Sequence, residues 1–436
     1  MKKRIMALIL GITLLASTAI AGCGNKQETT ESGAEEKITI RWVSLSPGKD
    51  GEEGKTKPIL EAFEEETGIR VEAEFYAITD LAEVIETKAA AGNTGYDVMS
   101  VDVTYIAKYG SSGYLEALDQ YFTDEEKAEW SDASLESGIW EDKLYAAPRN
   151  TSAQLLIYNK TLLEEAGITV PENSPENRLT YEQVAQLAKE GLEKLDPDGS
   201  RGLTGFDFQQ VSRVYQMNML PNSLGGKNIG DDGYEADGII NSKEWEEAMS
   251  WYQQLVQDGI ASRGYNAEQV AENFYSGKTL FMVGGTWTPT RMIAEDELGY
   301  AYAPCFEGYE DTTATGTGSW YMGMDAQSKE KEAAAEFIKF FTLGKGNDMW
   351  LEIDGAMPSR LAKVTEIEND PDASEALKIG AYESAHTAFP RAVTPAFGEY
   401  STILDQTWED VRNGADVKEA LDSAVEQLET AMSTYR

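Results

Sequence analysis

Short strand-like runs alternate with helical stretches along most of this chain, and this alternation constrains the fold more than any other feature. Residues 37–43, 69–75 and 96–101 are rich in β-branched residues, which predicts strands. Pro58–Thr67 and residues 81–91 carry apolar side chains at helical spacing, which predicts helices between those strands. Because the joining loops are short, neighbouring strands are expected to run parallel with helices packed across them. The sequence therefore predicts an α/β fold.

The same alternation continues toward the C-terminal end. Further strands are predicted over 143–147, 153–158 and 279–283, and further helices over 160–166, 181–194, 243–257, 330–342 and 416–432. Thr180 and Ser242 are helix caps in this interpretation, and Gly167 and Gly259 are stop signals. The polar stretch Pro171–Arg178 is expected to be a surface loop. With 436 residues and no short repeat, the chain is expected to form roughly two lobes of one α/β architecture.

The charge and the few His and Cys residues exclude several classes of protein. A formal net charge of −39 repels phosphate, so nucleic acid is not expected as a partner. The single histidine, His386, excludes multi-histidine zinc sites and is expected to be an exposed or capping residue. Two cysteines, Cys23 and Cys305, cannot build a four-cysteine metal site or a disulfide framework. Cys305 lies in an apolar stretch and is expected to be a buried structural thiol.

The first 36 residues are predicted to comprise a targeting sequence followed by a flexible tether. Residues 1–22 hold three basic residues and an apolar run that is short for a membrane span, which is typical of a signal peptide. The Ile-Ala-Gly-Cys sequence ending at Cys23 resembles the lipobox of bacterial lipoproteins, which implies cleavage before Cys23 and lipidation of its thiol. The alternative is an ordinary signal peptide with an incidental cysteine. Residues 23–36 are polar and acidic, so a flexible tether is expected there.

A set of short motifs is distributed in a specific order along nearly all of residues 37–436. They are Phe63-Glu-Glu-Glu-Thr-Gly-Ile-Arg-Val71, Tyr96-Asp-Val-Met-Ser with Gly113-Tyr-Leu-Glu-Ala-Leu-Asp119, Leu144-Tyr-Ala-Ala-Pro148, Ile157-Tyr-Asn-Lys160 with Glu165-Ala-Gly167, Phe274-Tyr-Ser-Gly-Lys278, Met282-Val-Gly-Gly-Thr-Trp287, the helix 333–341 and Gly355-Ala-Met-Pro358. Each motif is weak alone, but their order is specific. Together they resemble the bacterial extracellular solute-binding proteins of family 1, the maltose-binding-protein-like receptors of ABC importers. Tyr96 departs from the family, which often has proline there.

The resemblance implies a two-lobed periplasmic-binding-protein-like fold of type II, with hinge segments and a ligand cleft between the lobes. By motif order, lobe one would comprise residues 37–149 and 317–360, and lobe two residues 150–316 and 361–436. It implies a monomeric receptor, not an enzyme, that captures a sugar or oligosaccharide by hinge closure and delivers it to the permease subunits. No cofactor is implied. The protein would be lipid-anchored at the extracellular face of the cell membrane, or periplasmic in a Gram-negative host.

A sugar site needs an aromatic platform and a few fixed polar partners. Trp287 follows a predicted strand, where open α/β sheets place their ligands, and the family has a stacking aromatic at this motif. Trp320 lies among glycines at the expected second crossing, whereas Trp42 is expected in the core. The polar candidates, which follow strands or lie in crossings and in the C-terminal segment, are Ser44, Ser46, Asp102, Thr104, Arg149, Asn150, Arg391 and Tyr400. The two arginines among them would also suit a carboxylate or phosphate ligand.

Other functions stay open at this point. The same fold could bind an organic acid, a polyamine or a peptide. A secreted glycoside hydrolase would need two carboxylates about 5–9.5 Å apart, and no motif singles out such a pair or any catalytic residue. A surface adhesin is a third class. Asp196-Pro-Asp198-Gly lacks the spacing and closing Glu of a calcium loop, so no metal site is predicted.

Overall fold

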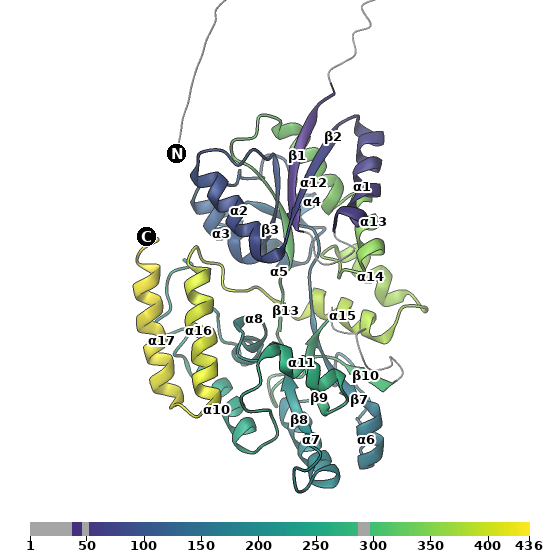
Figure 1. Ribbon diagram of the computed structural model, residues 1–436, viewed down its shortest axis with the longest axis vertical. Helices are drawn as coiled ribbons and strands as arrows, with labels where there is room; N and C mark the ends of the chain where they lie inside the picture. Colours follow the sequence, from purple (N-terminus) through teal and green to yellow (C-terminus); the bar gives the residue numbers. More distant parts are fainter. Residues whose placement is uncertain (1–36, 46–51, 287–296) are drawn as a thin grey trace, which may run out of the picture. The chain divides into compact units, whose positions relative to one another are not determined.

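The computed structural model describes residues 37–45, 52–286 and 297–436, and two main β-sheets organise them (Figure 1). Three residues that the sequence analysis singled out, Cys23, Ser46 and Trp287, lie outside the described residues. Residues Ile38–Arg436 cluster as one unit. The mixed sheets confirm the predicted α/β class.

The first sheet has five strands, and its pairing is mixed. In spatial order they are β2 (Arg70–Tyr76), β1 (Thr39–Leu45), β3 (Val98–Asp102), β12 (Trp320–Met324) and β6 (Ala146–Pro148). The neighbours β2, β1 and β3 run parallel, as the short βα connections predict. Strand β12 arrives from far along the chain and lies antiparallel to both β3 and β6. The end of β3 and the start of β12 are therefore adjacent.

Helices cover the first sheet and bury an aromatic core. They are α1 (Glu52–Thr67), α2 (Ile78–Ala90), α3 (Ile106–Ser111), α4 (Asp124–Lys127), α5 (Asp132–Ser137), α12 (Lys331–Thr342) and α13 (Lys345–Asp354), with the 3₁₀ turn η1 (Val103–Tyr105) and the hairpin β4 (Ile139–Trp140) and β5 (Lys143–Leu144). Trp42 of β1 is fully buried, as expected, and its ring lies 5.5 Å from Phe337 and 5.4 Å from Phe341. The Trp42 side chain thus packs in the core of the first sheet, as its mid-strand position predicted.

The second sheet has four strands and the larger core. In order they are β10 (Leu298–Ala301), β7 (Gln154–Asn159), β9 (Thr279–Gly285) and β8 (Thr204–Phe208), with β8 and β9 parallel and the other pairs antiparallel. The helices that follow in sequence are α6 (Lys160–Ala166), α7 (Tyr181–Leu195), α8 (Val214–Met217), α9 (Met219–Ser223), α10 (Lys243–Gln257), α11 (Ala267–Tyr275), α14 (Leu361–Asn369), α15 (Glu375–His386), α16 (Phe397–Arg412) and α17 (Val417–Met432). Helices α16 and α17 run side by side and pack on α10 (Figure 1).

One helix differs from its predicted start. Helix α1 begins at Glu52, so Pro58 lies inside it instead of at its first position. A proline there removes the hydrogen bond to the carbonyl of residue 54, and Gly54 has nothing within 4 Å of its Cβ position. Helix α1 packs on β2 and α13, and this packing accounts for a start that lies before Pro58 in the sequence. None of the described helices is long and apolar enough to span a bilayer.

Candidate functional site

Three chain segments pass between the two sheets and lie next to one another. The first, residues 149–153, joins β6 to β7, and the second, residues 317–319, leads from β11 (Thr315–Gly316) into β12. The hydroxyls of Thr151 and Thr317 are 2.7 Å apart, and the backbone N–H of Thr151 donates to the carbonyl of Met357 in the third segment. These hydrogen bonds bring the ends of β3, β12 and β6 close to the segments that lead away from the first sheet.

Two predicted site residues lie within the first crossing. The Asn150 side chain donates from Nδ2 to the hydroxyl of Ser319, at 2.6 Å, and so ties the first crossing to the second. Arg149 has only 1 % of its surface exposed, and its guanidinium carbon lies 4.5 Å from the ring centre of Trp350. The structure therefore places Arg149 in the core of the first sheet, whereas Asn150 is a brace between crossings.

The ends of β1 and β3 hold three more of the predicted residues. Ser44 is fully buried, and its hydroxyl lies 2.8 Å from that of Ser100 on β3. Asp102 ends β3 and caps η1, where its Oδ1 accepts from the backbone N–H of Thr104 at 3.0 Å and from the Thr104 hydroxyl at 2.7 Å. These capping hydrogen bonds fix the direction of the Asp102 carboxylate.

Arg391 reaches this carboxylate from the C-terminal part of the chain. Its NH1 lies 3.8 Å from Asp102 Oδ1, and its Nε donates to the carbonyl of Thr317 at 3.2 Å. The guanidinium lies over the ring of Tyr215 on α8, 4.1 Å from the centroid. A Cβ at Gly318 would come within 2.3 Å of Arg391 NH2, so a side chain at position 318 would displace the guanidinium from this position.

Tyr215 is the functional candidate that the sequence analysis missed. Its hydroxyl lies 2.8 Å from that of Ser152, which in turn donates to the carbonyl of Gly318 at 2.7 Å. Burial raises the pKa of Tyr215, and the nearby Arg391 charge partly opposes that shift. No motif marks Tyr215, because its importance comes from contacts with segments far away in sequence. Tyr105 also lies at the site, where it lines a recess with Asp102 and Trp320, and it directly follows the candidate Thr104 in sequence.

Trp320 and Tyr400 differ in their surroundings. Trp320 begins β12 opposite Asp102 in the β-ladder and is partly buried, with its side chain bordering a recess beside β3. Tyr400 on α16 is fully buried in the core of the second sheet, and its hydroxyl accepts from Asn218 Nδ2 at 3.0 Å. Burial raises the pKa of Tyr400 well above its usual range. The Trp320 ring is therefore partly accessible near the crossings, whereas Tyr400 is enclosed in the core of the second sheet.

Asp102 and Arg391 each border a hollow, and a larger hollow lies beside Thr104 and Tyr105. The larger hollow, of about 870 Å³, is lined mainly by residues of α2, η1 and α16 and by the C-terminal end of the chain, among them Thr104, Tyr105, Phe397, Glu399 and Tyr435. A second, of about 540 Å³, is lined by Trp140, residues 227–232 and Arg391, and a third, of about 180 Å³, by Asp102 and Trp320 with apolar neighbours. Among the described residues, no group of three or more His, Cys, Asp or Glu side chains is placed to hold a metal ion.

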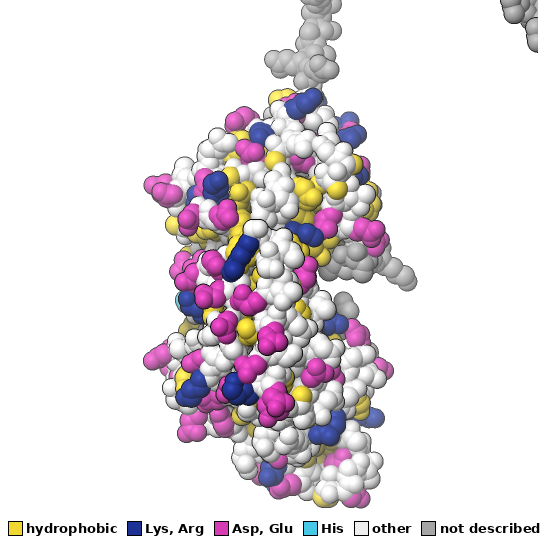
Figure 2. All heavy atoms as spheres, turned by 90° about the vertical axis from the view of Figure 1, so that its left-hand side faces the viewer, with side chains coloured by type: hydrophobic (Ala, Val, Ile, Leu, Met, Phe, Trp, Pro, Cys, Tyr) yellow, Lys and Arg dark blue, Asp and Glu magenta, His cyan; other side chains and the backbone are white. Residues whose placement is uncertain are grey.

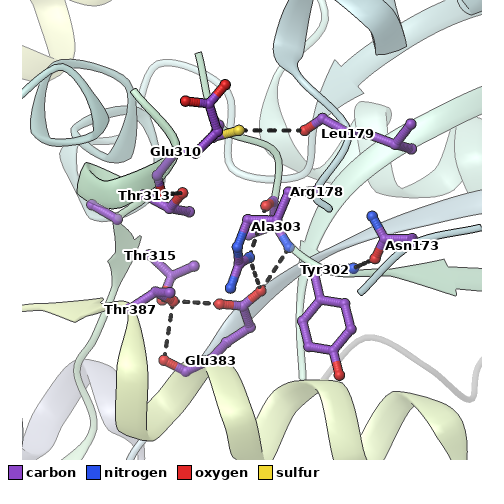
Figure 3. Close-up of polar contacts among 12 residues, drawn as sticks. Asn173, Arg178, Leu179, Tyr302, Ala303, Glu310, Thr313, Thr315, Glu383 and Thr387 are labelled. Carbon is purple, nitrogen blue, oxygen red and sulfur yellow. Dashed lines mark hydrogen bonds and ion pairs between the residues drawn. The ribbon is translucent and has the colours of Figure 1, made fainter. Parts of the chain in front are cut away.

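A buried ion pair joins Arg178 to Glu383 on α15, the helix that precedes the segment carrying Arg391, and Figure 3 shows this pair. Arg178 NH1 lies 2.5 Å from Glu383 Oε1 on α15, and the same carboxylate oxygen accepts from the backbone N–H of Ala303 at 2.8 Å. The Thr387 hydroxyl donates to the other oxygen of Glu383, and Thr387 immediately precedes β13 (Ala388–Phe389). The expected surface loop 171–178 is thus only partly at the surface, since Arg178 is buried by this pairing.

The remaining sequence candidates play structural parts. Cys305 is buried, as predicted, and burial raises the pKa of its thiol. The two acids of the Asp196–Asp198 turn accept hydrogen bonds from backbone N–H groups, including that of Leu203 at 2.9 Å to Asp196. The backbone bonds from Leu203 and Arg201 lower the pKa of Asp196. Hydrogen bonds from the side chain and then the backbone of Ser200 lower the pKa of Asp198. Acidic side chains are spread over the face shown in Figure 2 with basic ones between them, so the negative charge is not confined to one patch there.

The fold agrees with one class of binding protein, which the comparison with known families identifies. A family model described as bacterial extracellular solute-binding protein matches residues 48–347. This chain belongs to that family, as the ordered motifs predicted. The family is defined by binding a solute outside the cell.

Individual relatives extend the comparison over nearly the whole chain. The galactooligosaccharide-binding protein of Bacillus subtilis is 26% identical over 425 residues, which cover 94% of this chain and 93% of the relative. The multiple sugar-binding protein of Streptococcus mutans is 24% identical over 387 residues, covering 83% and 84%. Among solved structures, a cyclo/maltodextrin-binding protein complexed with maltotetraose superposes with a TM-score of 0.75 at 22% identity, covering 92% of this chain and 99% of that one. This structural likeness confirms the two-lobed, maltose-binding-protein-like fold.

Proposed function

We propose that this protein is the sugar-capturing receptor of an ABC importer. It binds a sugar or oligosaccharide between two lobes, closes around it by hinge motion and presents it to the permease subunits, without catalysis. Lobe one comprises residues 37–149 and 317–360, and lobe two residues 150–316 and 361–436. The separate cores of the two sheets support this division, because their members fall on either side of these boundaries.

The observation that carries the proposal is the convergence of Asp102, Arg391, Tyr215 and Trp320 at the crossings. A sugar presents hydroxyl groups at its edge and C–H groups on its faces. Charged groups held in fixed directions can exchange hydrogen bonds with the hydroxyls, and aromatic rings can pack on the faces. Asp102 supplies acceptors and Arg391 supplies donors from two distant parts of the chain. Trp287, which lies outside the described residues, is proposed as a further stacking ring.

The charges at this point favour a neutral ligand over an organic acid. Arg391 already faces the carboxylate of Asp102 at 3.8 Å, so its positive charge is partly balanced. Arg149, the other arginine considered for an anionic ligand, lies buried over Trp350. An incoming carboxylate would meet the negative charge of Asp102 together with the donors of Arg391, whereas a hydroxyl can bond to both. The saccharide names of the relatives from Bacillus subtilis and Streptococcus mutans agree with this preference.

The leader sequence supports a proposal for the location of the protein. We propose that residues 1–22 are removed, that Cys23 is lipidated, and that residues 23–36 tether a monomeric receptor to the outer face of the membrane. In a Gram-negative host the same protein would be periplasmic. A receptor held near its importer does not diffuse away after capturing its sugar.

A thermal-shift screen of the chain from Gly24 onward tests the proposed function. The probes are mono- and oligosaccharides, followed by organic acids, amino acids and polyamines. A ligand at 100 times its Kd stabilises by about 2.7 kcal/mol, which raises the melting temperature measurably. A sugar that stabilises the wild type and the exposed-aromatic control Tyr265→Ala, but not Trp287→Ala or Trp320→Ala, supports the proposal. A shift with only an acid or amine contradicts the sugar assignment, and a cleaved sugar contradicts the receptor role.

A further inference from the structure

The recess beside Trp320 is a small, mostly apolar pocket. Its volume is about 180 Å³. Its lining comes from α2, β3, η1, α3 and the start of β12, and comprises Leu81, Ala82, Ile85, Ser100, Val101, Asp102, Tyr105, Tyr109 and Trp320. Leu81, Ile85, Val101 and Tyr109 are each at most 2 % exposed and belong to one apolar cluster, against which Tyr105 and Trp320 pack. The walls are therefore held by the core of the first sheet.

Two of the polar groups at this recess have partners within the protein, whereas the buried Tyr109 hydroxyl has no hydrogen-bond partner among the described residues. The Ser100 hydroxyl accepts from Trp42 Nε1 at 3.1 Å and lies 2.8 Å from the Ser44 hydroxyl. Asp102 Oδ1 accepts two hydrogen bonds from Thr104. A pyranose carries several hydroxyls, and inside the recess the Tyr109 hydroxyl could pair with only one of them, so the others would be buried with few partners at a cost in binding free energy. The recess is thus unsuited to a pyranose and suited to an apolar group.

From this geometry we infer that the recess receives an apolar ring carried by the bound saccharide, as in an aryl glycoside. This inference rests on the proposed sugar-binding function. The size agrees, because an engineered apolar cavity of about 150 Å³ binds benzene, and this recess is only slightly larger. The connection to the site also agrees, because Asp102 and Trp320 belong both to the recess and to the polar convergence. A sugar bonded to Asp102 and Arg391 can therefore place its attached ring between Trp320, Tyr105 and α2.

The recess can be tested without any sugar. Fluorobenzene at millimolar concentration is added to the chain from Gly24 onward, and its ¹⁹F line width is measured. We expect broadening that disappears in Ala82→Phe, which places a ring in the recess, and persists in the matched control Ala90→Phe at the exposed end of the same helix. A melting curve of each variant checks that it is folded. Absence of broadening, or broadening that survives Ala82→Phe, overturns the inference.

A second experiment joins the recess to the sugar. The affinities of methyl and 4-nitrophenyl glycosides of maltose and galactose are compared by calorimetry. We expect the aryl glycoside of the recognised sugar to bind at least tenfold more tightly, which is about 1.4 kcal/mol, and this advantage to vanish in Ala82→Phe. Equal affinities of the methyl and aryl forms overturn the inference while the proposed function stands. If no saccharide binds in the thermal-shift screen, the proposed function fails, and the fluorobenzene result still decides whether the recess takes a ring.

Discussion

The carboxylate of Asp102 and the guanidinium of Arg391 lie 3.8 Å apart, although they come from the first sheet and from the C-terminal third of the chain. Each is fixed by its own neighbours. Thr104 holds Asp102, and the Thr317 carbonyl and the Tyr215 ring hold Arg391. Because both groups are directed before any ligand arrives, a solute that bonds to both gains affinity without ordering long side chains.

Removal of the Arg391 side chain should weaken sugar binding directly. Arg391→Ala deletes the donors and leaves Asp102 without its opposite charge. Hydrogen bonds to charged groups contribute about 1.5–3 kcal/mol, so the affinity for the sugar found in the thermal-shift screen should fall by about tenfold to a hundredfold. Calorimetry measures this change. Arg70→Ala, which alters an exposed arginine on β2, should leave the affinity unchanged, and a similar loss in both variants would contradict a specific role for Arg391.

Gly318 should be as sensitive as Arg391, although glycine has no side chain to bind anything. In Gly318→Ala the new Cβ would lie 2.3 Å from Arg391 NH2, so the guanidinium must move away from Tyr215 and Asp102. We expect at least a tenfold loss of sugar affinity with a folded protein. Gly54→Ala is the matched control, because nothing lies within 4 Å of its Cβ position. Unchanged affinity in Gly318→Ala would show that the position of Arg391 does not matter.

The sequence predicted the fold well where local signals are strong. Helices α6 and α10 have the predicted bounds, and Gly167 ends α6 in the left-handed conformation. Ser242 precedes α10 as predicted, but its side chain makes no capping hydrogen bond. Helix α7 begins with a capping box made by Thr180 and Gln183. The start of α1 was wrong by six residues, because packing on β2 and α13 outweighs the local signal of Pro58.

The candidate site was harder to predict than the fold, for reasons of geometry. The sequence can place Asp102 after a strand. It does not show that Arg391 approaches the Asp102 carboxylate or that the Arg391 guanidinium lies over the Tyr215 ring. The direction of a side chain depends on which helix face is buried, and this is why Tyr400 lies in the core. The sequence likewise predicts Arg178 as a surface-loop residue, because it does not show that Arg178 pairs with the buried Glu383.

The Arg178–Glu383 pair should matter strongly for stability. The exposed fractions of the two side chains are 4 % and 0 %, so removing one partner leaves a buried charge without compensation. Arg178→Met should lower the free energy of unfolding by about 3–5 kcal/mol, measured with urea. The double variant Arg178→Met/Glu383→Leu should recover part of this loss, but not all, because Ala303 N–H and Thr387 lose their acceptor. The exposed pair Lys418–Asp422 is the control, and its removal should cost less than about 1 kcal/mol.

Cys23 should determine where the protein resides. Cys23→Ser removes the thiol that would carry the lipid, so the protein should move from the membrane fraction to the soluble fraction of the cells. Incorporation of a labelled fatty acid measures the modification itself. Cys305→Ser is the matched control, because Cys305 is buried and far from the leader in sequence. Labelling of Cys23→Ser, or none in the wild type, would contradict the lipoprotein assignment.

Asp207 on β8 should make the fold less stable as the pH rises. The side chain is 1 % exposed, and burial raises its pKa from 3.8 to about 6, against the opposing effects of the Ser262 side chain and Arg412. The folded protein therefore binds this proton more tightly than the unfolded chain. Below pH 3.8 both states are protonated, and between pH 3.8 and 6 the unfolded chain loses its proton first. The free energy of unfolding should thus fall by about 3 kcal/mol across this window and stay lower above it.

The variant Asp207→Asn isolates this contribution of Asp207. It has no carboxyl group to ionise, so its free energy of unfolding should decline less than that of the wild type between pH 4 and 6.5. At pH 7.5 it should equal or exceed the wild type in stability, since no buried charge has to be desolvated. Urea unfolding at a series of pH values measures both effects. Asp372→Asn, at an exposed position, should keep the wild-type slope. A wild-type slope in Asp207→Asn would assign the pH dependence to other groups.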